Sequence, residues 1–329
     1  MNFGATILDA SGTRLSAEEK AFFVEADPFG FILFARNIDT PDQVRALTSE
    51  MREAVGRDAP ILIDQEGGRV QRMRAPHWRE WIPAREEIAR AGTHAEEVMY
   101  LRSRIMADEL RAVGVDTNCA PIVDVVCPDT HDFLTHRCYG DDPARVARIG
   151  RAVADGLLAG GVLPVVKHMP GHGRGTVDSH FALPATDAPV EVLSLTDFAP
   201  FKALNDLPIG MTGHVVFSAM DDKPATLSPR VMGHIREEIG FDGLIMTDDI
   251  TMKALDLGLE EIARGSLEAG CDVVLLCNAS LDDRRRVAAV SGRMSDVAQV
   301  RAERALAARK TPDEVDIPAL DAKLVARTA

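Results

Sequence analysis

Short apolar runs alternate along the chain with longer segments in which apolar residues recur at helical spacing. The runs predict eight strands, at 4–8, 30–34, 61–63, 117–125, 162–166, 209–216, 243–247 and 272–276. The periodic segments predict helices at 17–26, 41–55, 95–113, 143–159, 260–269, 281–290 and 297–308. Strands that alternate with helices in this way favour parallel pairing, because a parallel neighbour requires a crossover connection.

The predicted strands are almost continuously apolar, which indicates a sheet that is buried on both faces. Eight such units in a row predict an α/β fold with one (β/α)8 TIM barrel and a single domain. We expect the barrel to span residues 1–309, with residues 310–329 as a C-terminal extension. An open doubly wound sheet is the alternative, but the glycine-rich phosphate loop that usually follows its first strand is not present.

Composition and net charge exclude some classes of molecule as expected binding partners. The chain has 329 residues and a formal net charge of −14, so its surface repels nucleic acid and anionic lipid, and neither is an expected partner. We see no basic leader and no apolar run long enough to cross a membrane. The five cysteines match no zinc spacing. These features together predict a cytoplasmic protein.

Polar residues interrupt the predicted apolar strands at their carboxyl-terminal ends. The longest irregular stretches are 65–90, 127–142 and 169–196, and they follow the third, fourth and fifth strands. In a barrel these positions lie on the carboxyl-terminal face, where barrel enzymes carry their active sites. The polar residues at strand ends are Asp64, Asp124, Lys167, His168, His214 and Asp248.

Asp248 follows the mostly apolar stretch 244–247. A carboxylate that a strand presents rigidly is suited to attack the anomeric carbon of a sugar. An aspartate at this place can instead cap the next helix, and we assign that role to the neighbouring Asp249.

His180 ends a loop that contains Gly171, Gly173 and Gly175, and it lies two residues after Asp178. Imidazole transfers protons near neutral pH, and an aspartate can orient it. The glycines make the loop flexible, so the loop could deliver an acid to a bound sugar. The local sequence is equally compatible with a surface histidine.

Cationic side chains near the strand ends are candidates for binding sugar hydroxyls. Lys167 and His168 are adjacent, so one can face the pocket while the other faces a neighbouring element. Asp64 can accept hydrogen bonds from paired hydroxyls. Arg72 and Arg137 lie in loops after strands, and each by itself is more typical of a solvated surface charge.

Four ordered motifs carry a resemblance to a known family. They are DQEGGRVQR at 64–72, Arg137 before YGDDP at 139–143, KHMPGHG at 167–173 with DSH at 178–180, and TDD at 247–249. Over about 1–309, the chain resembles the glycoside hydrolase family 3 β-N-acetylhexosaminidases, specifically the single-domain bacterial enzymes of peptidoglycan recycling. The family often has serine and phenylalanine where Cys138 and Met169 stand, which affects the packing of the pocket.

The resemblance implies roles for the motif residues. Asp248 matches the nucleophile of the family, His180 matches the general acid/base, and Asp178 matches the aspartate that supports it. The residues that match positions binding the terminal N-acetylglucosamine are Asp64, Arg72, Arg137, Lys167 and His168. No metal and no cofactor are implied.

The implied activity is that of a retaining exo-β-N-acetylglucosaminidase, which works through a covalent glycosyl-enzyme. The resemblance suggests that it removes N-acetylglucosamine from GlcNAc-1,6-anhydro-MurNAc, with or without peptide, in peptidoglycan recycling. Its partner is then a small-molecule muropeptide or sugar substrate, and we expect a monomer.

Three other functions remain open at this point. A β-glucosidase or a glycoside phosphorylase of the same family is one, because a histidine acid/base repels phosphate less than a carboxylate does. A metal-dependent barrel hydrolase is another, since several histidines and aspartates could build a metal site. The third is a sugar-binding protein without catalysis, against which the presence of both Asp248 and His180 argues.

Overall fold

The computed structural model describes residues 2–177 and 182–329. In this part of the chain, eight parallel strands form one sheet in the order β10-β1-β2-β3-β4-β5-β7-β9. Their bounds are β1 (Gly4–Asp9), β2 (Pro28–Leu33), β3 (Ile61–Ile63), β4 (Thr117–Asn118), β5 (Leu163–Met169), β7 (Ile209–Thr212), β9 (Leu244–Met246) and β10 (Val274–Leu276). A parallel bridge between Met246 and Val273 joins the two edges. The predicted (β/α)8 barrel is therefore confirmed.

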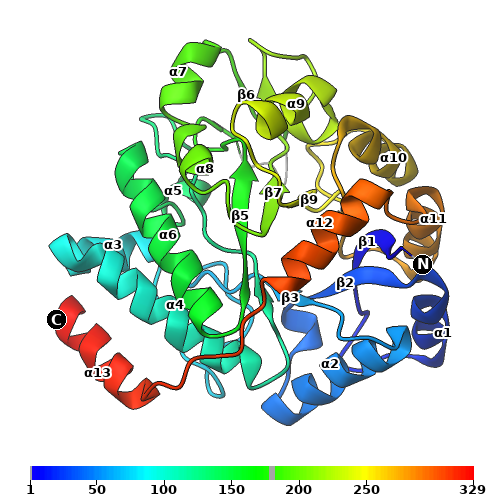
Figure 1. Ribbon diagram of the computed structural model, residues 1–329, viewed down its shortest axis with the longest axis horizontal. Helices are drawn as coiled ribbons and strands as arrows, with labels where there is room; N and C mark the ends of the chain where they lie inside the picture. Colours follow the sequence, from blue (N-terminus) through cyan, green and yellow to red (C-terminus); the bar gives the residue numbers. More distant parts are fainter. Residues whose placement is uncertain (1, 178–181) are drawn as a thin grey trace.

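The helices lie around these strands (Figure 1). They are α1 (Ala17–Ala26), α2 (Pro41–Val55), α3 (Ala84–Ala91), α4 (Ala95–Arg111), α5 (Asp132–Thr135), α6 (Pro143–Ala159), α7 (Val190–Leu195), α8 (Ala199–Ala203), α9 (Pro229–Glu237), α10 (Leu259–Ala269), α11 (Leu281–Ser291), α12 (Asp296–Ala307) and α13 (Ile317–Thr328). In the described residues no helix is both long and apolar enough to cross a membrane.

The core has two layers, because side chains alternate between the two faces of a strand. One apolar cluster fills the barrel interior and includes Phe29, Leu163 and Ile209. Ala298 and Ala302 of α12 belong to the same cluster, so α12 closes the amino-terminal end of the barrel. The larger cluster lies between the strands and the surrounding helices. Polar residues lie at the carboxyl-terminal end of the barrel.

Two strands are shorter than the sequence predicted. β4 ends at Asn118 rather than 125, since Pro121 has no N–H to donate, and only a single bridge from Ile122 to Lys167 continues the pairing. β7 ends at Thr212 rather than 216. Val216–Phe217 instead forms β8, which pairs with β6 (Ala185–Thr186) outside the barrel.

The stretches that we expected to be irregular contain short helices. α3 begins within 65–90 and ends at Ala91, α5 lies within 127–142 and α7 within 169–196, and α9 fills part of the connection from β7 to β9. A start signal for α9 is present in the sequence, because Ser228 precedes Pro229 and its Oγ accepts from the N–H of Val231 at 3.1 Å. Serine followed by proline is therefore informative here even where apolar periodicity is short.

The last helix packs on the outside of the barrel. α13 contacts α4 and α3, with Leu324 buried. Lys323 and Arg327 both pair with Glu97 of α4, at 2.7 and 3.0 Å. This end of the chain (red in Figure 1) lies beside α3 and α4, away from the carboxyl ends of the strands.

Candidate active site

Asp248 stands at the carboxyl end of β9. Thr247 fixes this end of the strand, since its Oγ1 accepts from the N–H of Leu275 in β10 at 2.9 Å. The Asp248 side chain is half-buried, and its Oδ1 accepts from the N–H of Asp249 at 2.8 Å. The strand therefore presents one carboxylate in a fixed position, as we predicted from the apolar residues before it.

The surroundings of Asp248 keep it ionised. Burial alone would raise its pKa, but the positive charge that His168 and His214 can carry, together with the Asp249 N–H, holds the pKa of Asp248 below its usual value. An ionised carboxylate is the form that can act as a nucleophile.

The expectation that Asp249 caps the next helix is wrong. No helix begins at this point, and α10 starts at Leu259. The Asp249 carboxylate instead accepts from the N–H of Thr251 at 3.0 Å and from the N–H of Cys277 at 3.2 Å. It thus ties the loop after β9 to the end of β10. Burial, with the charge of Asp248, raises the pKa of Asp249 to about 6.

A cavity of about 400 Å³ lies beside Asp248. Asp64 and Arg72 line the same cavity, although they lie far from Asp248 in the sequence. The remaining lining residues are Ile32, Phe34, Met211, Asp249, Thr251, Met252, Lys253, Leu275, Cys277 and Asn278. The structure therefore brings the predicted nucleophile and two predicted sugar-binding residues to one hollow.

Asp64 is the centre of a charged network. It follows β3, and its two carboxylate oxygens accept from Arg72 Nη2 and Lys167 Nζ, both at 2.9 Å. Lys167 Nζ lies 2.7 Å from Glu66 Oε1. Arg137 Nε and Nη2 each donate to Glu66 at 2.8 Å, a two-bond geometry that fixes the guanidinium plane. The network joins the loops after β3 and β4 to β5.

The network keeps its members charged. Burial would raise the pKa of both carboxyl groups, but Lys167 and Arg72 hold that of Asp64 far below its usual value. Arg137 and Lys167 lower the pKa of Glu66 to about 2. The Asp64 and Glu66 carboxylates raise the pKa of Lys167, against the effect of its burial. These groups present fixed charges to a ligand at neutral pH.

Glu66 is a residue that our sequence analysis missed. It lies in the motif at 64–72 and is buried, yet we gave it no role. A glutamate within a few residues of a strand end is a weak signal. What makes Glu66 important is contact with Lys167 and Arg137, which are remote in the sequence.

Asp124 positions His168. Its Oδ2 lies 2.7 Å from His168 Nδ1, and its Oδ1 accepts from the N–H of His172 at 2.7 Å. Asp124 is fully buried, so this contact fixes the imidazole and directs Nε2 away from Asp124. We had noted Asp124 at a strand end without assigning it this role.

Neither candidate arginine is a solvated surface charge, so that interpretation was wrong. The Arg137 side chain is only 10% exposed, and its guanidinium lies 4.9 Å from the ring centre of Phe133. Arg72 is 25% exposed and lies 5.2 Å from the ring centre of Phe34. Ion pairing and aromatic contact hold both cations beside the strand ends.

Asp178 and His180 lie outside the described residues, so their predicted roles stay predictions. The alternative of a metal site can be examined in 2–177 and 182–329. No group of three or more His, Cys, Asp or Glu side chains in these ranges is arranged to hold a metal ion.

Comparison with known proteins adds independent information. A family model described as the glycosyl hydrolase family 3 N terminal domain matches residues 7–306. A beta-hexosaminidase of Methylococcus capsulatus is 38% identical over 308 residues, covering 87% of this chain and 91% of that protein.

Solved structures agree with this similarity. Native NagZ from Neisseria gonorrhoeae matches with a TM-score of 0.86 and 30% identity over 100% of this chain and 96% of that one. The same protein in complex with N-trifluoroacetyl-D-glucosamine matches with a TM-score of 0.84 and 29% identity, covering 100% and 97% of the two chains.

Proposed function

Since the chain belongs to glycosyl hydrolase family 3 and is a glycoside hydrolase of the β-N-acetylhexosaminidase type, we propose that it is a retaining exo-β-N-acetylglucosaminidase. The observation that carries this proposal is the cavity in which the ionised Asp248 meets Asp64 and Arg72. In that arrangement a nucleophile lies beside groups that bind hydroxyls.

Fixed charges would hold the terminal sugar. Asp64 accepts hydrogen bonds from hydroxyl groups, while Lys167 and Arg72 donate to hydroxyl oxygens. Lys167 and Arg72 each already contact Asp64 at 2.9 Å, so little reorganisation is needed when a sugar binds. Arg137 and His168 complete the proposed binding set, held in place by Glu66 and Asp124.

The proposed chemistry is a double displacement. Asp248 attacks the anomeric carbon and forms a glycosyl ester, while His180 donates a proton to the oxygen of the leaving group. Asp178 supports His180. A water molecule then attacks the same carbon, gives its proton to His180, and releases Asp248 and the sugar.

The natural substrate that we propose is GlcNAc-1,6-anhydro-MurNAc, with or without peptide, in peptidoglycan recycling. We propose that the enzyme acts on it as a monomer in the cytoplasm. The support is the family membership together with the site chemistry, and cell fractionation and size-exclusion chromatography test the last two points.

The activity itself is tested by a panel of aryl glycosides. We expect turnover of the β-N-acetylglucosaminide, with kcat/KM at least about tenfold above that of the matching β-glucoside and β-xyloside. A substrate that lacks a group which the site is built to contact reacts more slowly by a factor of this order or more. A preference for the glucoside would contradict the proposal, as would a rate that depends on added phosphate and yields a sugar phosphate.

The stereochemistry gives a separate prediction. Two displacements at one carbon retain configuration, so proton NMR of the first product from a β-glycoside should show the β-anomer before mutarotation. If the α-anomer is formed first, water attacks the sugar directly and Asp248 is not a covalent nucleophile.

A further inference from the structure

The cavity beside Asp248 has a second wall, which the proposed sugar-binding residues do not form. It consists mainly of residues after β9 and β10, which lie across the barrel from β3 in the strand order, and it includes Phe34, which follows β2 and lies beside Arg72. Its members are Phe34, Thr251, Met252, Lys253, Cys277 and Asn278. A molecule attached to the reacting carbon needs a surface of this kind once the terminal sugar occupies the other wall.

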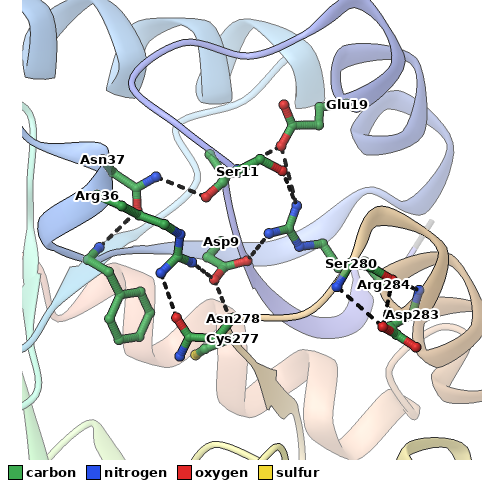
Figure 2. Close-up of polar contacts among 12 residues, drawn as sticks. Asp9, Ser11, Glu19, Arg36, Asn37, Cys277, Asn278, Ser280, Asp283 and Arg284 are labelled. Atoms are coloured by element: carbon green, nitrogen blue, oxygen red, sulfur yellow. Dashed lines mark hydrogen bonds and ion pairs between the residues drawn. The ribbon is translucent and has the colours of Figure 1, made fainter.

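Asn278 has a fixed orientation in this wall. Its backbone is left-handed, with φ of 55°, and its N–H donates to Asp9 Oδ2 at 2.6 Å. Asp9 also pairs with Arg36 and with Arg284, as Figure 2 shows. The buried Asp9 carboxylate therefore connects β1 and α11 to the segment that carries Asn278.

Arg36 orients the side-chain amide of Asn278. Arg36 Nη1 donates to Asn278 Oδ1 at 2.5 Å (Figure 2). A guanidinium can only donate, so the amide oxygen must face Arg36 and Nδ2 must face away from it. In the described residues Nδ2 has no hydrogen-bond partner, which leaves two N–H groups for a molecule in the cavity that Asn278 lines.

Lys253 supplies a cation at the same wall. Its side chain is exposed and forms no ion pair with the described residues. Asp248 is anionic, and the chain as a whole carries −14, so a negatively charged molecule near the nucleophile would be repelled. An unpaired lysine offsets that repulsion, and Phe34 and Met252 give apolar contact beside it.

We propose that Lys253 and Asn278 form a leaving-group site that selects leaving groups carrying a carboxylate. Ammonium and amide N–H groups are both donors to carboxylate oxygens. The inference rests on the proposed glycosidase activity and adds to it the residues that recognise the released half of the substrate.

The test compares two synthetic β-N-acetylglucosaminides. One has para-carboxyphenol as its leaving group, and the other has the methyl ester of the same phenol, which is neutral. The measured quantity is the ratio of kcat/KM for the acid to that for the ester. Each variant is compared with the wild type on the same two compounds, so the intrinsic reactivity of the leaving groups cancels.

We expect Lys253→Met, which keeps the aliphatic stem, to lower the ratio about three- to tenfold, as for loss of one charged hydrogen bond at a partly exposed site. Lys253→Glu should lower it further. Asn278→Asp should also lower it, and aspartate tolerates the left-handed backbone. Lys202→Met, on α8 and exposed, should leave the ratio unchanged.

Salt provides an internal check. About 1 M NaCl should lower the wild-type ratio toward that of Lys253→Met, because exposed charges are screened. If all variants keep the wild-type ratio, or if they lower the rates for acid and ester equally, Lys253 and Asn278 do not select a carboxylate. If the wild type hydrolyses neither compound, the proposed function itself fails.

Discussion

Replacing Asp248 by alanine should lower kcat for an aryl β-N-acetylglucosaminide by about a thousandfold or more. That factor corresponds to about 4 kcal/mol of transition-state stabilisation. Asp248 lies at a strand end, is ionised and lines the cavity with Asp64 and Arg72, while the neighbouring Asp249 carboxylate is held by the N–H groups of Thr251 and Cys277. Steady-state kinetics on the purified variant, compared with the wild type, measure the loss.

Azide tests the role of Asp248 more directly. In Asp248→Ala, the space of the carboxylate becomes available to a small anion on the same face of the sugar. Azide should then restore part of the rate and form the α-glycosyl azide, with the aryloxide as leaving group. Asp256→Ala, in the same loop and exposed, should keep wild-type activity. Near wild-type activity of Asp248→Ala without azide would remove its proposed role.

Replacing Glu66 by glutamine should destabilise the protein by about 3–5 kcal/mol, the usual cost of breaking a buried ion pair by removing one partner. Glu66 accepts two hydrogen bonds from Arg137 and lies 2.7 Å from Lys167. Glutamine keeps the shape but leaves these two buried cations with less negative charge. Chemical denaturation at pH 7 measures the free energy of unfolding, and the same variant should raise KM because Lys167 and Arg137 lose their positions.

The destabilisation caused by Glu66→Gln should decrease as the pH falls. The pKa of Glu66 is about 2 in the folded protein, against an ordinary value of 4.5. A carboxyl group with a lowered pKa stabilises the folded state fully above its unfolded value and loses that contribution as the pH falls. The difference between wild type and Glu66→Gln should therefore be largest above pH 4.5 and shrink as the pH falls toward 2.

A matched control separates this effect from the simple loss of a negative charge. Glu80 pairs with Arg74 at 2.8 Å, and the two side chains are 50% and 42% exposed. Glu80→Gln should change stability by less than about 1 kcal/mol. If Glu66→Gln lowers the free energy of unfolding by no more than this control does, the ion pairs of the network around Asp64 are not buried in solution.

The barrel was predictable because strand and helix periods are local properties of the sequence. Apolar runs such as 61–63 and 209–212 lie in strands β3 and β7, and the helices at 17–26, 41–55 and 143–159 have the predicted bounds. Strand ends were less predictable. β4 ends at Asn118 and β7 at Thr212 because of their backbone hydrogen bonding, which the hydrophobicity of the sequence does not report.

The site was partly predictable for the same reason. In a parallel barrel, residues at the carboxyl ends of strands must share one face, so Asp64, Lys167 and Asp248 could be grouped from the order of strands along the chain. Their chemical roles were suggested by the motifs, and the nucleophile role of Asp248 remains a proposal to be tested.

The sequence by itself determined the fold class and the face that carries the site, since both follow from periodicity and chain order. Only the tertiary structure determined which charged side chains contact one another. Glu66 gains its importance from Arg137 and Lys167, Asp124 from His168, and Asn278 from Asp9 and Arg36. Ion pairs and hydrogen bonds act over a few ångströms between residues that are remote along the chain, and the sequence pattern does not specify those distances.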